Sequence, residues 1–316
     1  TGDERIKPSQ IVVDGNGDYI VYGGCEGYID SDSECLDSSY SLTFSTFIMK
    51  FWGSNGTLQW AESMDPVDQS WKGEISIDSN NDIFVSGGYG CSGGSCTVIN
   101  DLSAIPSYSG GGIYIAKLWS NGTWVWVNHA GLTGSACGYT SPAHTGLGAA
   151  VLDSSGDFYV AGDFYKKGYD NSGNFLGYCS ATVSFGLYGV TAADGPAIFI
   201  AKANTSTGSW EWAIGANGDD SEYIVDLSVN GLGVRAHGHT TSASLSFDST
   251  TTLTNQADGF TGLAESGATS FHISIDSDGT WGEIITPGVS SDSSTSSTHA
   301  SSSSSGFAVV GKSWPG

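Results

Sequence analysis

The residues best suited to chemistry lie in two short stretches in which oxygen-bearing side chains alternate with other residues. Each stretch reads Asp-x-Asn-x-Asp, and together they comprise Asp14, Asn16 and Asp18, and Asp78, Asn80 and Asp82. Alternating carboxylate and amide oxygens are typical of Ca²⁺ loops, although both stretches lack the later Glu that completes such a loop. Both also coincide with expected hairpin turns, where Asp and Asn are common. Ca²⁺ is therefore a candidate cofactor, and ordinary turn formation is the alternative.

Two further groups have the composition of metal sites. The loop between Cys25 and Cys35 gathers four acidic residues, which are Glu26, Asp30, Asp32 and Glu34. His237-x-His239 places two imidazoles on one face of an expected strand, as a transition-metal pair would require. No cysteine or carboxylate lies close to these histidines in the sequence, so polar histidines without a metal are the alternative.

The motifs of common catalytic sites are absent from the sequence. We find no Gly-x-Ser-x-Gly elbow, no unpaired cysteine beside a histidine and no singular pair of carboxylates. The sequence therefore predicts a protein that is not an enzyme. Because 33 acidic residues are present, a glycan-acting enzyme with carboxylates in a central channel is kept as an alternative.

The six cysteines favour disulfides over zinc. Two pairs each lie within one loop at corresponding places of two repeats, and two cysteines are left over, so the expected bonds are Cys25 with Cys35, Cys91 with Cys96, and Cys137 with Cys179. An even number of cysteines without the His/Cys spacing of zinc sites is typical of proteins outside the cytoplasm.

Three Asn-x-Ser/Thr sequons occur at equivalent turns, at Asn55, Asn121 and Asn204. N-glycosylation at these turns would suit a surface protein. The alternative is that Asn-Gly is favoured because it forms a tight hairpin turn, and that the following Thr is favoured in a strand.

Tryptophans recur at two positions of the last strand of each repeat. The first position is held by Leu58, Trp124, Trp210 and Trp281, and the second, two residues later, by Trp60, Trp126 and Trp212. Strand side chains alternate between faces, so we expect both positions on one face, packed between neighbouring repeats. A sugar-binding platform is the alternative. Trp52, Trp71 and Trp119 lie outside these positions and are the candidate ligand-contacting aromatics.

Three of the ten basic residues also share one repeat position. They are Lys50, Lys117 and Lys202, and Ser274 stands there in the fourth repeat. Their recurrence predicts structural partners, which we expect to be the aspartates of the preceding hairpin, Asp18, Asp82 and Asp157.

A repeated block positions all of these residues. A first strand that leads into a tight turn and a second strand ending in Gly recurs from Ile11, Ile75, Ala150 and Asp226, each time followed by a second hairpin. The Asn-Gly, Asn-Asn and Ser-Gly turns permit the positive φ of a two-residue hairpin turn, and glycines break any helical period. The sequence therefore predicts one all-β domain over 1–316, a β-propeller of four-stranded antiparallel blades with repeats at about 10–66, 73–130, 146–216 and 222–286 and an incomplete fifth at 290–316.

The blocks VDGNGDYIVYGG from Val13 and IYIAKLWSNGTWVW from Ile113 resemble the repeats of the bacterial and archaeal β-propeller repeat family, often called seven-bladed propeller repeats. The resemblance covers nearly the whole chain, from about Ile11 to Gly311. It implies the propeller fold and leaves the function open, because propellers serve in binding, scaffolding and catalysis.

Composition indicates a secreted globular protein. The net charge is −23, which disfavours nucleic acid and anionic membranes as partners. No run of apolar residues is long enough to span a membrane. The chain begins at Thr1 without Met, as if a signal peptide had been removed or the chain trimmed, so we expect an extracellular or cell-surface location.

The sequence-based prediction of function is a structural or adhesion protein that self-associates into a surface layer or filament. The segment GFAVVGKSWPG supplies only the first two strands of a fifth blade, and neither terminus contains the missing strands. An open blade edge exposes unpaired backbone with which another chain can pair. A carbohydrate-binding propeller is the first alternative, and glycans are therefore candidate partners.

Overall fold

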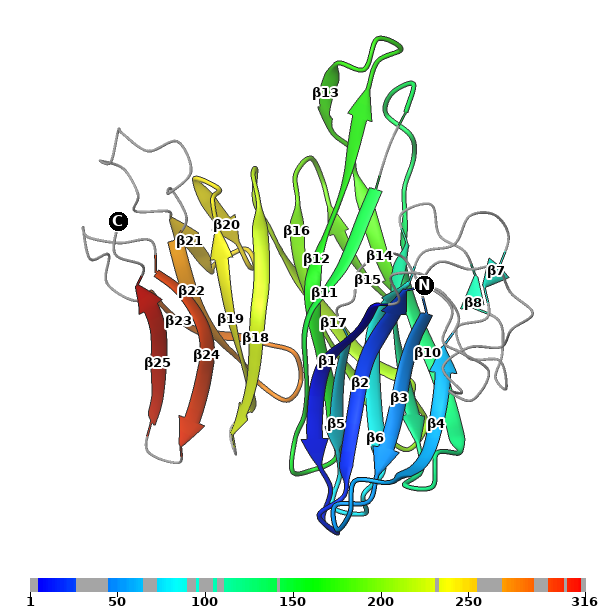
Figure 1. Ribbon diagram of the computed structural model, residues 1–316. Coiled ribbons are helices and arrows are strands. Elements are labelled where there is room, and N and C mark those ends of the chain that lie inside the picture. Colours follow the sequence, from blue (N-terminus) through cyan, green and yellow to red (C-terminus); the bar gives the residue numbers. More distant parts are fainter. Residues whose placement is uncertain are drawn as a thin grey trace. The chain divides into compact units, whose positions relative to one another are not determined.

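The computed structural model is built from strands alone. It describes residues 5–26, 45–64, 73–89, 95–96, 105–106, 111–140, 143–230, 233–254, 269–286, 295–303 and 306–313. Within these ranges there is no helix, and paired strands run antiparallel (Figure 1). The predicted all-β class with antiparallel sheets is therefore confirmed.

The strands form two compact units, which we describe separately. The first unit comprises residues 1–131 together with 204–209, and the second comprises 132–203 and 210–316.

The first unit contains the first two repeats. Its first sheet has the order β1-β2-β3-β4, with bounds Arg5–Val13, Tyr19–Glu26, Ser45–Phe51 and Leu58–Met64. In the second repeat, neighbouring strands pair in the order β5, β6, β9 and β10, with bounds Gly73–Ile77, Ile83–Tyr89, Gly112–Leu118 and Trp124–Thr133. The short strands β7 (Ser95–Cys96) and β8 (Ile105–Pro106) pair with each other.

The second unit contains the later repeats. Its largest sheet has the order β11-β12-β16-β17-β20-β21, with bounds Ala143–Leu152, Asp157–Tyr169, Ala197–Asn204, Trp210–Asn217, Ser244–Ser246 and Thr252–Thr254. Strand β13 (Phe175–Tyr178) pairs with β12, and β14 (Ala181–Phe185) pairs with β15 (Tyr188–Ala192).

The fourth repeat is a four-stranded sheet of order β18-β19-β22-β23, with bounds Glu222–Asn230, Gly233–Thr240, Thr269–Ile275 and Trp281–Ile285. After it, β24 (Thr295–Ser303) and β25 (Gly306–Ser313) form a two-stranded sheet.

Aspartates shape the first hairpin turn of successive repeats. The Oδ1 atom of Asp14 accepts hydrogen bonds from the N–H groups of Asn16, at 2.8 Å, and Asp18, at 2.9 Å. Asp78 and Asp153 make the same pair of bonds within their own turns. These bonds satisfy backbone donors that the turn leaves without a ladder partner, so Asp at this position favours the turn.

A one-residue bulge recurs where the third strand meets the fourth. Trp126 lies opposite Lys117 whereas Trp124 lies opposite the next residue, Leu118, so Val125 has no partner in the ladder. The same irregularity occurs in the first and third repeats. An extra residue reverses the alternation of side chains. The two tryptophan positions therefore lie on opposite faces, and the expectation that they share one face was wrong.

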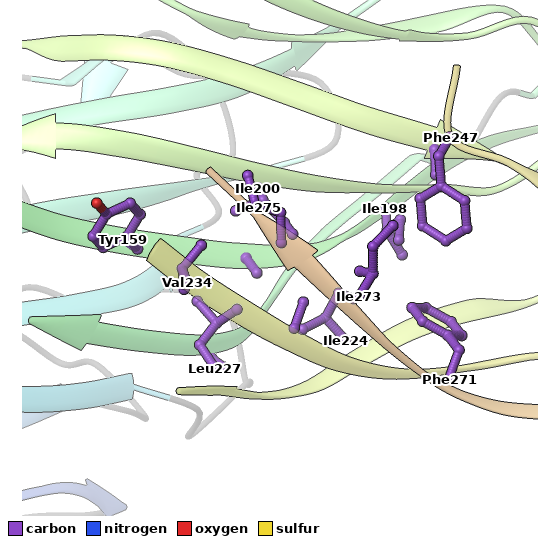
Figure 2. Packing of buried hydrophobic residues seen from close by; sticks show 14 of the residues in the cluster. Tyr159, Ile198, Ile200, Ile224, Leu227, Val234, Phe247, Phe271, Ile273 and Ile275 are labelled. Atoms are coloured by element: carbon purple, nitrogen blue, oxygen red, sulfur yellow. The ribbon is translucent and has the colours of Figure 1, made fainter. Parts of the chain in front are cut away.

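Each unit has its own apolar core. In the second unit, Ile198, Ile200, Ile224, Phe271 and Ile273 pack in one buried cluster (Figure 2). The core of the first unit combines both of its repeats, because Ile20, Tyr22 and Ile48 from the first pack with Ile75 and Val85 from the second. Aromatic and β-branched residues fill these cores and fit the strand propensities of the sequence.

Candidate functional site

The turn between the third and fourth strands has the same construction in four repeats. A backbone hydrogen bond joins its first residue to its last in the segments 52–57, 119–123, 204–209 and 276–280. Its glycine has a positive φ each time: Gly56, Gly122, Gly208 and Gly279. We call these four segments the docking turns, because three of them receive a tryptophan.

In the first three repeats, the tryptophan at the second position packs on the docking turn of the following repeat. The indole N–H groups of Trp60, Trp126 and Trp212 donate to the carbonyl oxygens of Ser120, Thr205 and Ser277, at 3.1, 3.1 and 2.9 Å. A Cβ built on Gly122, Gly208 or Gly279 would lie within 2.9 Å of the ring concerned. Only glycine lets the ring approach this closely. The expected packing role of the second position is therefore observed at all three tryptophans.

The first tryptophan position faces the opposite way. Trp124 donates its indole N–H to Glu62 of the first repeat at 3.1 Å. We call the face that carries Lys50 and Trp60, or their counterparts, the forward face, and the one that carries Phe51 and Leu58 the rear face.

The recurring lysines pair with aspartates of the hairpin turns, as the sequence predicts. The Nζ atoms of Lys50, Lys117 and Lys202 lie 3.7, 2.9 and 2.8 Å from Oδ2 of Asp18, Asp82 and Asp157. Lys50 makes its shortest ion pair with Asp14, at 2.7 Å, and both side chains are almost completely buried. Each of the first three repeats thus carries a cation that cross-links its first hairpin to its third strand.

The lysine–aspartate ion pairs use carboxylates that the sequence suggested as Ca²⁺ ligands. Burial raises the pKa of Asp14, but the hydrogen bonds from Lys50 and from the Asp18 and Asn16 amides outweigh it and lower the pKa overall. Asn16 and Asn80 are exposed at the turn tips, while Asp78 Oδ1 already accepts two turn amides. Among the described residues, no group of three or more His, Cys, Asp or Glu is placed to hold a metal.

The sequons lie on the docking turns. Asn55 Oδ1 accepts from the backbone N–H and the hydroxyl of Thr57, and Asn121 accepts from the N–H of Thr123. Asn204 Oδ1 accepts from the N–H groups of the second and third residues after it. Asn55 and Asn121 are exposed and Asn204 is half-buried. Glycosylation of these residues stays a prediction.

The candidate ligand aromatics lie at the start of the first two docking turns. Trp52 is 48% and Trp119 is 50% exposed, so each presents part of its ring to solvent. They hold the same repeat position in neighbouring repeats. Trp71 lies outside the described residues.

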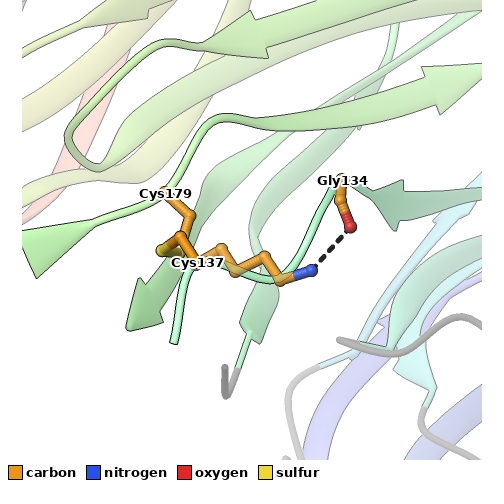
Figure 3. Close-up of a disulfide and its surroundings, with 4 residues drawn as sticks. Gly134, Cys137 and Cys179 are labelled. Carbon is orange, nitrogen blue, oxygen red and sulfur yellow. Dashed lines mark hydrogen bonds between the residues drawn. A yellow bond between two sulfur atoms is a disulfide. The ribbon is translucent and has the colours of Figure 1, made fainter. Parts of the chain in front are cut away.

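The predicted bond between Cys137 and Cys179 is present (Figure 3). It lies in the second unit, where Cys179 donates its N–H to the carbonyl of Lys166, and the Lys166 ammonium donates to the carbonyl of Gly134 at 2.7 Å. Together these contacts hold the segment after β10 against β12. The expected partners of Cys25 and Cys96 are Cys35 and Cys91, which lie outside the described residues, so those two bonds stay predictions.

An aromatic cluster that the sequence reasoning missed lies on the β12–β13 hairpin, which extends beyond the neighbouring strands (Figure 1). The rings of Tyr165 and Tyr178 are 6.2 Å apart, and those of Phe175 and Tyr178 are 5.5 Å apart. The ammonium of Lys167 lies 4.8 Å from the centre of the Tyr165 ring. His144 stacks on Tyr165 and pairs with Asp163. Phe175 and Leu176 are exposed at the tip.

Glu222 has the most perturbed carboxyl of the described residues. Burial raises its pKa to about 7, although hydroxyl hydrogen bonds from Ser242 and Thr240 act in the opposite direction. Ser242 also accepts the N–H groups of Asp219 and Asp220. Glu222 is 1% exposed, so it fixes this corner of the second unit and is closed to a substrate.

A third histidine packs against the two histidines of β19. His237 stacks on His272, with ring centres 4.4 Å apart, and His239 lies edge-on to His237. Burial and the neighbouring imidazoles lower the pKa of His237 to about 4. His239 Nδ1 is 2.9 Å from the hydroxyl of Ser270. The pair predicted from His237-x-His239 is thus part of an uncharged, stacked group on β19 and β22.

Comparison with known proteins adds no family assignment. No protein-family model matches the chain, and no curated protein matches it either. Among the residues that the structure describes, no helix has the length and apolarity needed to cross a membrane.

Proposed function

We propose that this chain is a non-enzymatic structural or adhesion protein of the extracellular space, built as a β-propeller and able to associate with further copies. The observation that carries the proposal is the recurring tryptophan contact between repeats. Trp60, Trp126 and Trp212 are each used to fix one repeat to the next.

The contacts between first strands support the propeller. In a propeller, the first strand of each blade lies nearest the central axis, beside the first strand of the next blade. Within the first unit, β1 contacts β5, and within the second, β11 contacts β18 and β18 contacts β24. The incomplete fifth repeat, which has only β24 and β25 among the described strands, supports an open blade.

Electron microscopy of the native particle tests this proposal. We expect ring-shaped protomers in contact with one another, and mass spectrometry of the secreted protein is expected to find glycans on Asn55 or Asn121, both exposed. An isolated, elongated monomer at all concentrations would refute the proposal. So would hydrolysis of a glycan by the purified chain.

Carbohydrate binding is the second candidate, favoured by the aromatic cluster on the β12–β13 hairpin. The exposed ring of Phe175 and the half-buried rings of Tyr165 and Tyr178, with Lys167 beside them, can stack on sugars and bond to their hydroxyls. Glycan-array binding that is lost in Phe175→Ala and kept in Leu187→Ala would support it, since Leu187 is exposed on a different hairpin. Absence of binding to any glycan would exclude it.

A further inference from the structure

The rear face of the first sheet carries two continuous apolar rows. Residues directly opposite one another in an antiparallel sheet lie on the same face. Register places the first row at Val13, Tyr19, Phe51 and Leu58, and the second at Ile11, Val21, Met49 and Ala61. Each row crosses all four strands. We call these eight residues the rear apolar face.

Much of this face is exposed. Ile11 is 61%, Val13 59%, Tyr19 40% and Leu58 47% exposed. A Cβ built on Gly56, in the docking turn beside Leu58, would meet no described atom within 4 Å. A large contiguous apolar surface of this kind marks an interaction site in a soluble protein.

The equivalent rows of the second and fourth repeats are buried at their two middle strands. In the second repeat the row is Ile77, Ile83, Leu118 and Trp124, and in the fourth it is Val229, Val234, Ile275 and Trp281. Ile83, Leu118, Val234 and Ile275 are at most 1% exposed. In the second and fourth repeats these positions therefore pack against the preceding repeat of the same unit, whereas four residues of the rear apolar face are at least 40% exposed.

The charge of the chain favours contact between two copies at the rear apolar face. The chain carries a net charge of −23, so two copies repel each other over most of their surfaces. None of the eight residues of the rear apolar face is charged. A contact at this face removes apolar area from water and adds no buried charge.

The forward face of the fourth sheet does not match it. Two registered rows there read Asp226, His237 and His272, and Ser228, Arg235 and Ser274. Glu283 stands where the first three repeats have their docking tryptophan. His237 is 2% and His272 is 5% exposed, so this part of the face is already covered within the chain and is not free to receive the rear apolar face of another copy.

We propose that the rear apolar face packs against the same face of a second copy, giving a closed two-fold dimer. An apolar face is complementary to itself, and a two-fold axis brings each residue of the face to the equivalent surface of the partner. Two sheets packed face to face interdigitate their side chains, as the repeats do within the chain. This inference rests on the self-association in the proposed function and identifies its surface.

Sedimentation equilibrium over a range of protein concentrations tests the dimer. We expect Val13→Glu and Leu58→Glu each to raise the dimer dissociation constant by at least about tenfold, because the charge enters the interface twice. Leu187→Glu, at a fully exposed site of another hairpin, is the matched control and is expected to leave it unchanged. Added NaCl is expected to strengthen the dimer by screening repulsion.

A cysteine at the centre of the row tests the symmetry. Tyr19→Cys is expected to form a disulfide between two copies under mild oxidation, and the control Leu187→Cys is not. Assemblies that persist unchanged in Val13→Glu would overturn the dimer and leave the proposed self-association standing. A monomer at every concentration, with the thiol introduced by Tyr19→Cys unreactive, would overturn both and would show that the chain covers this face itself.

Discussion

The indole N–H of Trp212 donates a hydrogen bond to the carbonyl oxygen of Ser277 at 2.9 Å, and the same ring packs on Gly279. One side chain thus makes both the hydrogen bond and the packing contact with this turn. The contact gives the turn carbonyl a donor and packs the ring against glycine, the only residue type that leaves room for it. Equivalent contacts at Trp60 and Trp126 make this the defining contact between repeats.

Removing this ring should therefore be costly. We expect Trp212→Ala to lower the free energy of unfolding by about 3–5 kcal/mol, measured by denaturant titration, because it leaves a cavity. Trp212→Phe keeps most of the packing and loses the donor, so we expect about 1 kcal/mol. Trp119→Ala, at a half-exposed ring, is the control and is expected to have little effect. Equal losses at Trp119 and Trp212 would contradict the docking role.

The ion pair of Lys50 and Asp14 gives a second prediction. Lys50→Met leaves a buried carboxylate without its cation, so we expect a loss of about 3–5 kcal/mol. Lys117→Met should cost less, because Lys117 and Asp82 are more exposed. A double-mutant cycle of Lys50→Met with Asp14→Asn measures the coupling. A coupling near zero would show that the pair is not what stabilises the hairpin.

Metal removal should have a small effect. Turn amides and Lys50 already satisfy the carboxylate of Asp14, and Asp82 is paired with Lys117. We expect EDTA to shift the melting temperature little. A large loss of stability in EDTA that Ca²⁺ restores and Mg²⁺ does not would show that Asp14, Asp18 and their counterparts bind Ca²⁺ after all.

Glu222 should make stability depend on pH. Its pKa is raised from 4.5 to about 7 in the folded state, so the folded chain binds more protons than the unfolded chain between these values. Stability from this group is therefore full below pH 4.5 and lost as pH rises to 7. We expect Glu222→Gln to be more stable than the parent at pH 8 by up to about 3 kcal/mol, with the difference vanishing near pH 4.5. A constant difference across this range would refute the assignment.

His237 acts in the opposite direction and must be separated from Glu222. Its pKa falls from 6.5 to about 4 on folding, so its contribution is full above pH 6.5 and is lost as pH falls towards 4. Comparing Glu222→Gln with its parent at each pH removes this second effect, because His237 is present in both.

The cysteines give the last prediction. Alkylation of the denatured, unreduced protein should find no free thiol, because Cys137 and Cys179 are bonded and the other four cysteines are expected to pair. The bond spans 42 residues, so replacing both partners by Ser should cost about 4 kcal/mol by the loop-entropy estimate. Two or more alkylated cysteines would overturn both the remaining pairings and the extracellular assignment.

Recurring residues made much of the fold predictable. Trp126 and Lys117 each belong to a set of the same residue type at the same spacing, and repetition of this kind indicates packing and pairing in every repeat. What sequence could not show was the bulge at Val125, because no residue type is specific for it. That single residue puts Trp124 and Trp126 on opposite faces.

Features that occur once were harder to predict. The aromatic cluster on the β12–β13 hairpin has only one signal in the sequence, the density of rings between Tyr165 and Tyr178. The exposure of Ile11 has none, because Ile75, the same residue type at the same repeat position, is 2% exposed. Burial there depends on the neighbouring repeat and not on the local sequence.

The direction of the tryptophan contacts sets an order for assembly on the ribosome. Trp60, Trp126 and Trp212 each reach a carbonyl that lies 60, 79 and 65 residues further along the chain. The indole contact of a nascent repeat therefore cannot form until most of its successor has been synthesised. Each newly made repeat completes the one before it, and translation pauses within a repeat would prolong the exposure of an indole that has nowhere to bind.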